Sequence, residues 1–161
     1  MENNTAIQIV KDLPNKKVNI RREFDAPADL IWRAWTESTL LDQWWAPKPW
    51  MTKTKSMQFK AGGNWFYAMA GPDGTEHWNR VEFTAIKDNK SFETSSSFTD
   101  DNGNHIPDLP TMHWKNVFIP KGSGTTVEVE ISFTKKQTCN KSLRWDLRPD
   151  SLLHLGILKY Y

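Results

Sequence analysis

Six segments between residues 51 and 134 alternate apolar and polar side chains, and this alternation constrains the fold more than any other feature. They are 52–59, 63–70, 75–87, 90–99, 111–120 and 124–134, and glycine-containing turns join most of them. A period of two is typical of strands that bury one face. Turns of hairpin length make consecutive strands antiparallel. With the alternating segment 17–24, the sequence predicts an antiparallel sheet of seven strands.

Two short helices are predicted between the first strand and the other six. Residues 25–36 (DAPADLIWRAWT) have helical apolar spacing, with Asp25 as the expected cap and Pro27 in the first turn. Residues 38–45 (STLLDQWW) form a second helix, capped by Ser38. Because one face of the sheet is too apolar to remain in water, helices must cover it. The expected class is therefore α+β.

The order of these elements, together with several motifs, resembles a known family. The motifs are RREFDAPADLIWRAWT (21–36), LLDQWWAP (40–47), the glycine pair 62–63 followed by Trp65, and MAGPDG (69–74). They are similar to the helix-grip fold of the START and birch-pollen-allergen (SRPBCC) superfamily. Within that superfamily, they resemble the bacterial proteins related to the activator of the heat-shock-protein-90 ATPase. The resemblance covers residues 16–134.

The resemblance implies a β-α-α-β6-α order, in which a curved seven-stranded sheet wraps a long C-terminal helix. An apolar cavity lies between sheet and helix in this superfamily, and many members have no assigned ligand or reaction. We therefore expect residues 1–15 to be a polar N-terminal lead and residues 16–161 to form a single START-like domain.

The segment 135–161 departs from the family pattern. Pro149 would break a long helix, and the part after it, DSLLHLGILKYY, is apolar on nearly all sides. Codons for residues 138–160 can be chosen so that a shifted frame reads NLQQIIEMGFKTGFTASLGNLEI. That string has the amphipathic spacing of the family's last helix. We interpret 135–161 as a frameshifted end, and sequencing the gene tests this interpretation.

Charge and composition limit the classes of partner and the cellular location that we expect. The net charge is +2 with Lys and Arg scattered along the chain, so no nucleic-acid partner is expected. No apolar run approaches the roughly 20 residues that span a membrane, and the N-terminus lacks the features of a signal peptide. The single cysteine, Cys139, cannot form an intramolecular disulfide and fits a reducing cytoplasm. We expect a cytoplasmic protein.

Nine tryptophans, several of them between residues 32 and 50, suggest aromatic side chains that close one end of the gripping sheet. Trp32 and Trp35 are expected in the core. For the adjacent Trp44 and Trp45, core packing and ligand contact both remain open. An aromatic wall with a few polar groups is typical of a small-molecule pocket. The candidate cavity residues are Trp44, Trp45, Trp65, Tyr67, Met69, His77, Trp78, Arg80, Phe83, Phe98, Met112 and Trp114.

Evidence for catalysis is sparse. The four histidines and one cysteine have no metal-ligand spacing, and the loop at 100–103 lacks the later acidic ligand of a calcium loop. No nucleophile or phosphate-loop motif occurs. A buried pair, Glu76 with His77 or Glu82 with Arg80, could still act as acid and base, and His77 could meet His113 across strands. We expect no metal and no cofactor, and favour a non-enzyme.

Three functions remain open at this stage. The first is a domain that binds a small apolar or amphipathic molecule in an internal cavity. The second is a protein-interaction or co-chaperone module that activates a chaperone ATPase. The third is a cyclase- or hydrolase-like enzyme that uses the cavity, by analogy with other members of the superfamily. Exposed apolar surface in the tail could also promote a homodimer.

Overall fold

The computed structural model describes residues 8–12, 14–46, 49–107 and 111–133. The elements in chain order are β1 Gln8–Asp12, β2 Lys17–Phe24, α1 Ala28–Thr36, α2 Ser38–Trp44, β3 Met51–Met57, β4 Asn64–Ala70, β5 Glu76–Lys87, β6 Ser91–Thr99, β7 Met112–Lys121 and β8 Gly124–Phe133. None of the helices found in these residues is long and apolar enough to cross a membrane.

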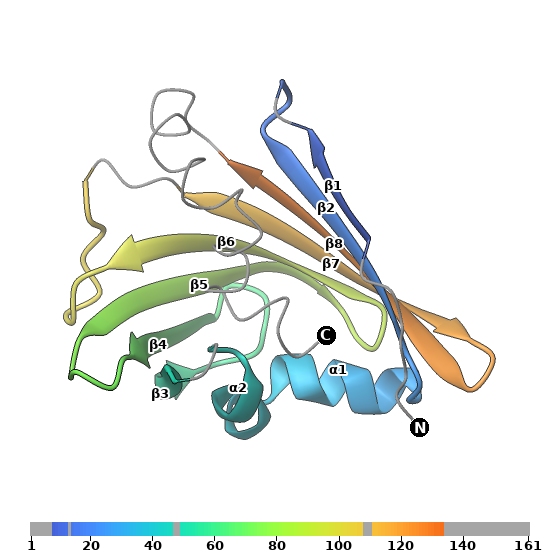
Figure 1. Ribbon diagram of the computed structural model, residues 1–161, viewed down its shortest axis with the longest axis horizontal. Helices are drawn as coiled ribbons and strands as arrows, with labels where there is room; N and C mark the ends of the chain where they lie inside the picture. The colour runs from blue at the N-terminus through green and yellow to red at the C-terminus, as the bar shows by residue number, and fades with distance from the viewer. Residues whose placement is uncertain (1–7, 13, 47–48, 108–110, 134–161) are drawn as a thin grey trace.

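All strands belong to one antiparallel sheet with the order β1-β2-β8-β7-β6-β5-β4-β3. The strands after α2 follow one another as hairpins, and β2 pairs with the last described strand, β8. Figure 1 shows the sheet as a curved layer with α1 and α2 on one side. This confirms the predicted α+β architecture of a large curved antiparallel sheet and two helices.

The prediction of seven strands is wrong, because the sheet has eight among the described residues. The additional strand is β1, which lies within the segment expected to be only a polar lead. It pairs with β2 in the register Ile9↔Ile20 and forms one edge of the sheet. A strand of five residues is too short to show a clear period of two. It forms because its backbone pairs with that of β2 at the edge of the sheet.

Two helix caps also differ from expectation. Pro27, rather than Asp25, occupies the N-cap of α1, and Glu37, rather than Ser38, occupies that of α2. Neither cap residue makes a side-chain hydrogen bond to its helix. The helices instead gain their stability from packing, as is usual for helices this short.

The glycine pair before β4 sets how this strand begins. Gly62 has a φ of +84°, and a Cβ on Gly63 would lie 2.2 Å from the carbonyl oxygen of Gln58. Only glycine tolerates both conditions without strain. The tight turn lets β4 start with Trp65 buried and directed toward the helices.

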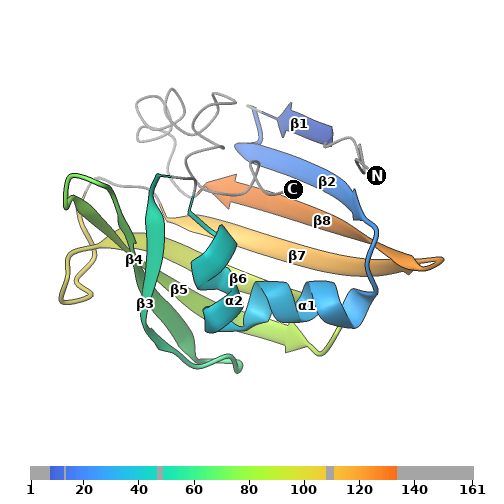
Figure 2. The same ribbon diagram turned by 60° about the horizontal axis from the view of Figure 1, so that its bottom comes forward.

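The core lies between the concave face of the sheet and the two helices, and Figure 2 shows α1 and α2 lying across that face. Trp32 of α1 makes edge-to-face contacts with Phe59, Phe92 and Phe118, at ring-centroid distances of 5.2–5.8 Å. Thr36 donates a hydrogen bond to the carbonyl of Trp32. The expectation that Trp32 and Trp35 are core residues is confirmed, because both are buried.

The expectations for Pro149, the frame-shifted end, Cys139 and the whole segment 135–161 lie outside the described residues.

Candidate functional site

Trp45, at the end of α2, is the centre of an aromatic cluster against the sheet. Its ring centroid lies 5.4 Å from that of Trp65, 5.9 Å from Trp114 and 6.4 Å from Tyr67. Trp35 of α1 joins the same cluster at 6.2 Å. The Trp65 and Tyr67 contacts are edge-to-face, an arrangement that the ring quadrupoles favour. The cluster therefore connects both helices to β4 and β7.

Hydrogen bonds fix three of the indole rings in this region. Trp44 donates its Nε1–H to the carbonyl of Ala34, Trp45 donates to the Tyr67 hydroxyl, and Trp65 donates to Thr54 Oγ1, each at 2.9 Å. Thr54 in turn donates to a carboxylate oxygen of Asp42. Buried polar atoms that are paired in this way hold aromatic rings in one orientation.

A small hollow of about 30 Å³ lies within the cluster. A volume of this size holds a water molecule and is too small for an organic ligand. Its described lining is mostly aromatic and aliphatic, with a polar stripe on β6 and β7. The lining residues are Trp35, Leu41, Trp45, Met57, Trp65, Val81, Phe83, Phe92, Thr94, Ser96, Trp114 and Asn116.

Two buried polar atoms in this lining have no hydrogen-bond partner among the described residues. They are Nε1 of Trp114 and Oδ1 of Asn116, on side chains that are only 5% and 2% exposed. The other end of the Asn116 amide is used, because its Nδ2 donates to the carbonyl of Phe92 at 3.4 Å. Two residues of the lining therefore carry a buried donor and a buried acceptor that the described part of the chain leaves unpaired.

The structure brings part of the predicted cavity set together. Trp45, Trp65, Phe83 and Trp114 line the hollow. Tyr67, Met69 and Met112 are buried near it on the same face of the sheet. Phe98 is partly buried against the same core.

The other predicted cavity residues lie elsewhere. Trp44 packs edge-to-face on Trp35 and Trp45 rather than lining the hollow. His77 stacks on Trp50, with ring centroids 5.4 Å apart. Phe66 lies between Trp65 and Tyr67 in β4, so its side chain points to the convex face. Arg80 is opposite Phe66 in β5, and Arg80 and Trp78 therefore also lie on the convex face.

Sequence reasoning missed the polar part of the lining, which comprises Thr94, Ser96 and Asn116. A signal for Asn116 was available, because Met112, Trp114, Asn116 and Phe118 follow the period of two and must share one face. The predicted set contained only aromatic, methionine, histidine and arginine side chains, so it did not include the amide of Asn116.

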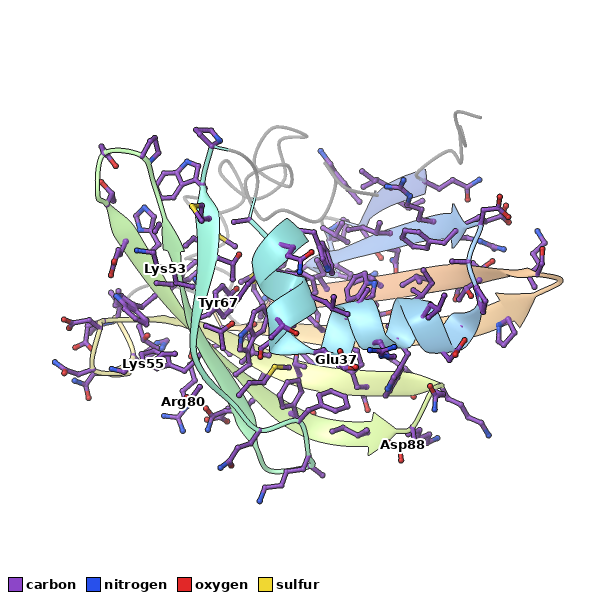
Figure 3. The ribbon with its side chains drawn as sticks, turned by 90° about the horizontal axis from the view of Figure 1, so that it is seen from below. Glu37, Lys53, Lys55, Tyr67, Arg80 and Asp88 are labelled. Atoms are coloured by element: carbon purple, nitrogen blue, oxygen red, sulfur yellow. The ribbon has the colours of Figure 1, made fainter. Side chains whose placement is uncertain are left out.

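The convex face of β3–β5 presents a separate cationic and aromatic group. Lys55 Nζ lies 5.5 Å from the ring centroid of Phe66 and 5.6 Å from that of Trp78. Figure 3 shows Lys53, Lys55 and Arg80 on the far side of β3 from α2, whereas Tyr67 lies close to α2. Lys53 Nζ lies 3.9 Å from a carboxylate oxygen of Glu76, and Arg80 Nε lies 3.6 Å from a carboxylate oxygen of Glu82.

None of the predicted acid–base pairs is buried. The Arg80 and Glu82 side chains are 42% and 58% exposed, and Glu76 interacts with Lys53 instead of His77. His77 and His113 do not meet, since β6 separates their strands and His113 contacts Glu93. In the described part of the chain, no three His, Cys, Asp or Glu side chains gather as a metal site.

Burial and hydrogen bonding nevertheless perturb the pKa values of individual groups. Burial raises the pKa of the Tyr67 phenol, which keeps it protonated. In the loop after β6, hydrogen bonds from Asn104, first from its backbone N–H, hold the pKa of Asp100 below its ordinary value. The Asp100 carboxylate is thus engaged by the loop's own amides.

A second hollow, of about 260 Å³, lies where β2 ends beside the β7–β8 hairpin. Its lining includes Glu23 and Lys121, whose side chains form a 2.7 Å salt bridge. Lys121 lowers the pKa of Glu23. This hollow is more polar and more open than the aromatic one, so it does not match the enclosed apolar cavity that the family resemblance implies.

A sequence profile described as Activator of Hsp90 ATPase homolog 1-like protein matches residues 25–150. The chain belongs to this family. The resemblance drawn from the motifs of α1, α2 and β4 is thereby confirmed. None of the curated proteins compared with the chain matches it.

Solved structures of bacterial proteins share the fold of this family member. Protein Ms6760 from Mycobacterium smegmatis is 23% identical, covering 94% of this chain and 95% of its own, with a TM-score of 0.80. A protein from Arthrobacter aurescens is 25% identical, with 92% and 86% covered and a TM-score of 0.84. Protein NE0264 from Nitrosomonas europaea is 21% identical, with 91% and 96% covered and a TM-score of 0.72. Proteins with this fold commonly bind ligands or act as activators.

Proposed function

We propose that this family member binds a small apolar or amphipathic molecule between its two helices and the concave face of the sheet. The observation that carries the proposal is the polar stripe formed by Thr94, Ser96 and Asn116 in an otherwise aromatic wall. A wall needed only for packing would be apolar, because burying a polar group without a partner is costly.

The interior must enlarge to accept a ligand, because the hollow of about 30 Å³ has room for water only. Met57 is suited to this movement, since it lines the hollow, is only half-buried and has a flexible side chain. Trp45, Trp65, Phe83 and Trp114 are the proposed first contacts, because they already border the hollow. Tyr67, Met69 and Met112 would be reached by a larger molecule. The proposal involves no reaction, metal or cofactor.

Native mass spectrometry of the purified protein, beside its denatured mass, tests this function. We expect a reproducible additional mass under native conditions that is absent after denaturation. Ser96→Leu should abolish this mass, because the added side chain fills the hollow. The matched control is Ser95→Leu on the adjacent residue, which faces the opposite side of β6 and should retain the ligand.

Both variants need a check of folding by circular dichroism, because overpacking a core costs roughly 1–3 kcal/mol. A compact wild-type monomer that carries no additional mass would contradict the proposal.

A second candidate is a protein-interaction module that acts on a chaperone ATPase. The cationic and aromatic group of Lys55, Phe66 and Trp78 on the convex face favours it, as does the description of the family. If native mass spectrometry shows no additional mass on the wild-type protein, this second function becomes the favoured one. For either function we propose a cytoplasmic location and a single domain, which includes strand β1 as well as residues 16–161.

A further inference from the structure

The two unpartnered atoms in the hollow come from neighbouring inward-facing residues of β7. Trp114 and Asn116 are two residues apart, so their side chains leave the same face of the strand about 7 Å apart at the Cα atoms. Trp114 offers an indole N–H donor, and Asn116 offers a carbonyl acceptor. Both atoms are buried without a partner among the described residues.

Three neighbouring indoles, two of them in the same lining, differ from Trp114 in this respect. Trp44, Trp45 and Trp65 all donate to protein acceptors at 2.9 Å, but Trp114 has no acceptor among the residues that the structure describes. An unmade buried hydrogen bond destabilises a fold. A bound group that accepts from Trp114 and donates to Asn116 would satisfy both atoms together.

We propose that Trp114 and Asn116 recognise the hydroxyl group of a small neutral molecule with an aromatic or apolar body. The hydroxyl oxygen accepts from Trp114 Nε1–H, and the hydroxyl hydrogen is donated to Asn116 Oδ1. This inference rests on the proposed function and adds to it the chemical class of the ligand and the residues that select it.

Other polar groups satisfy the pair less well. A carboxylate has no proton to donate to Asn116, and none of the described residues that line the hollow is charged to compensate it. An ammonium group donates but cannot accept from Trp114. The body of the ligand is assigned from its surroundings, because the rings of Trp45, Trp65 and Phe92 favour an apolar or aromatic group.

Phenol and toluene are the probes for a test, since they have nearly the same shape and toluene carries a methyl group where phenol carries its hydroxyl. Binding is measured by titration, followed through the indole N–H signals in ¹H–¹⁵N spectra. We expect wild type to bind phenol at least about tenfold more tightly than toluene. The Trp114 indole proton should move downfield with phenol and not with toluene.

Asn116→Leu removes the acceptor while keeping the side chain about the same size. It should weaken phenol binding by about tenfold or more and leave toluene binding unchanged or tighter. Lys115→Leu is the matched control, because it changes the adjacent, exposed residue on the outer face. Trp114→Phe provides a second variant that removes the donor and should also lower the preference for phenol.

The outcomes separate this inference from the proposed function. Equal binding of phenol and toluene, or an undiminished phenol preference in both Asn116→Leu and Trp114→Phe, would overturn the inference and leave the pocket intact. In that case the two atoms hold only a water molecule. Failure of both probes to bind would count against the pocket itself and, with it, against the inference.

Discussion

At the scale of single residues, the hydrogen bond from Trp45 to Tyr67 is the clearest link between the helices and the sheet. The two residues are 22 positions apart, and the 2.9 Å bond between them is buried. The Tyr67 hydroxyl is the acceptor that keeps the Trp45 N–H paired. Burial also makes ionisation of this phenol unfavourable, so its pKa in the folded protein is raised above the ordinary value of 10.0.

Tyr67→Phe should therefore have two effects. At neutral pH the free energy of unfolding should fall by about 1–3 kcal/mol, because the buried Trp45 donor loses its acceptor. In wild type, the raised pKa of Tyr67 contributes stability that is present below pH 10 and is lost as the pH rises beyond it, since only the unfolded chain then ionises. The variant should lose less stability over that alkaline range. Urea unfolding at several pH values measures both effects.

Trp78→Phe, a change on the convex face, is the control for this prediction. Trp78→Phe should lose as much stability at alkaline pH as wild type does, because it keeps the Tyr67 phenol. An identical alkaline loss in wild type and Tyr67→Phe would contradict the assignment.

At the scale of elements, local periodicity predicted most of the sheet. The bounds of β2–β8 agree with the predicted strands within two residues, because each segment shows the alternation of apolar and polar residues in its own sequence. Strand β1 could not be predicted in this way, since it depends on pairing with β2. The predicted helix caps were wrong. Asp25 and Ser38 belong to common cap residue types, but packing rather than capping determines where these short helices begin.

The candidate site was predicted in part for a related reason. His77 and Trp78 were both placed in the cavity, although adjacent residues of a strand point to opposite faces. Which of the two faces inward depends on the register between β4 and β5, a long-range property. Trp45, Trp65 and Trp114 were predicted because aromatic residues dominate the wall. Asn116 was not predicted, because a single amide within an apolar set does not by itself indicate a binding residue.

Helix α1 gives a direct test of packing at this scale. Trp32→Ala should lower the free energy of unfolding by about 3–5 kcal/mol, because a buried ring in contact with three phenylalanines is lost. Leu30→Ala on the same helix is the matched control. Leu30 is 49% exposed, so its replacement should change stability by less than about 0.5 kcal/mol. Similar losses in both variants would mean that α1 does not cover the sheet as described.

At the scale of the whole molecule, the aromatic cluster makes the helices and the sheet depend on each other. Trp35 and Trp45 from the helical region contact Trp65, Trp114 and Phe118 from β4 and β7. The proposed ligand site lies at this junction, so a ligand that enters must move side chains shared by both layers. Unfolding of either layer would expose the same rings.

This shared core predicts one cooperative unfolding transition. Tryptophan fluorescence reports mainly on the cluster, whereas far-ultraviolet circular dichroism reports mainly on the sheet. We expect both signals to give the same urea midpoint, because the sheet cannot keep its buried face once the helices leave it. Ser96→Leu and Asn116→Leu should shift both midpoints together. A fluorescence transition at lower urea than the circular dichroism transition would instead show that α1 and α2 open before the sheet unfolds, and the site would then be open in the partly unfolded state.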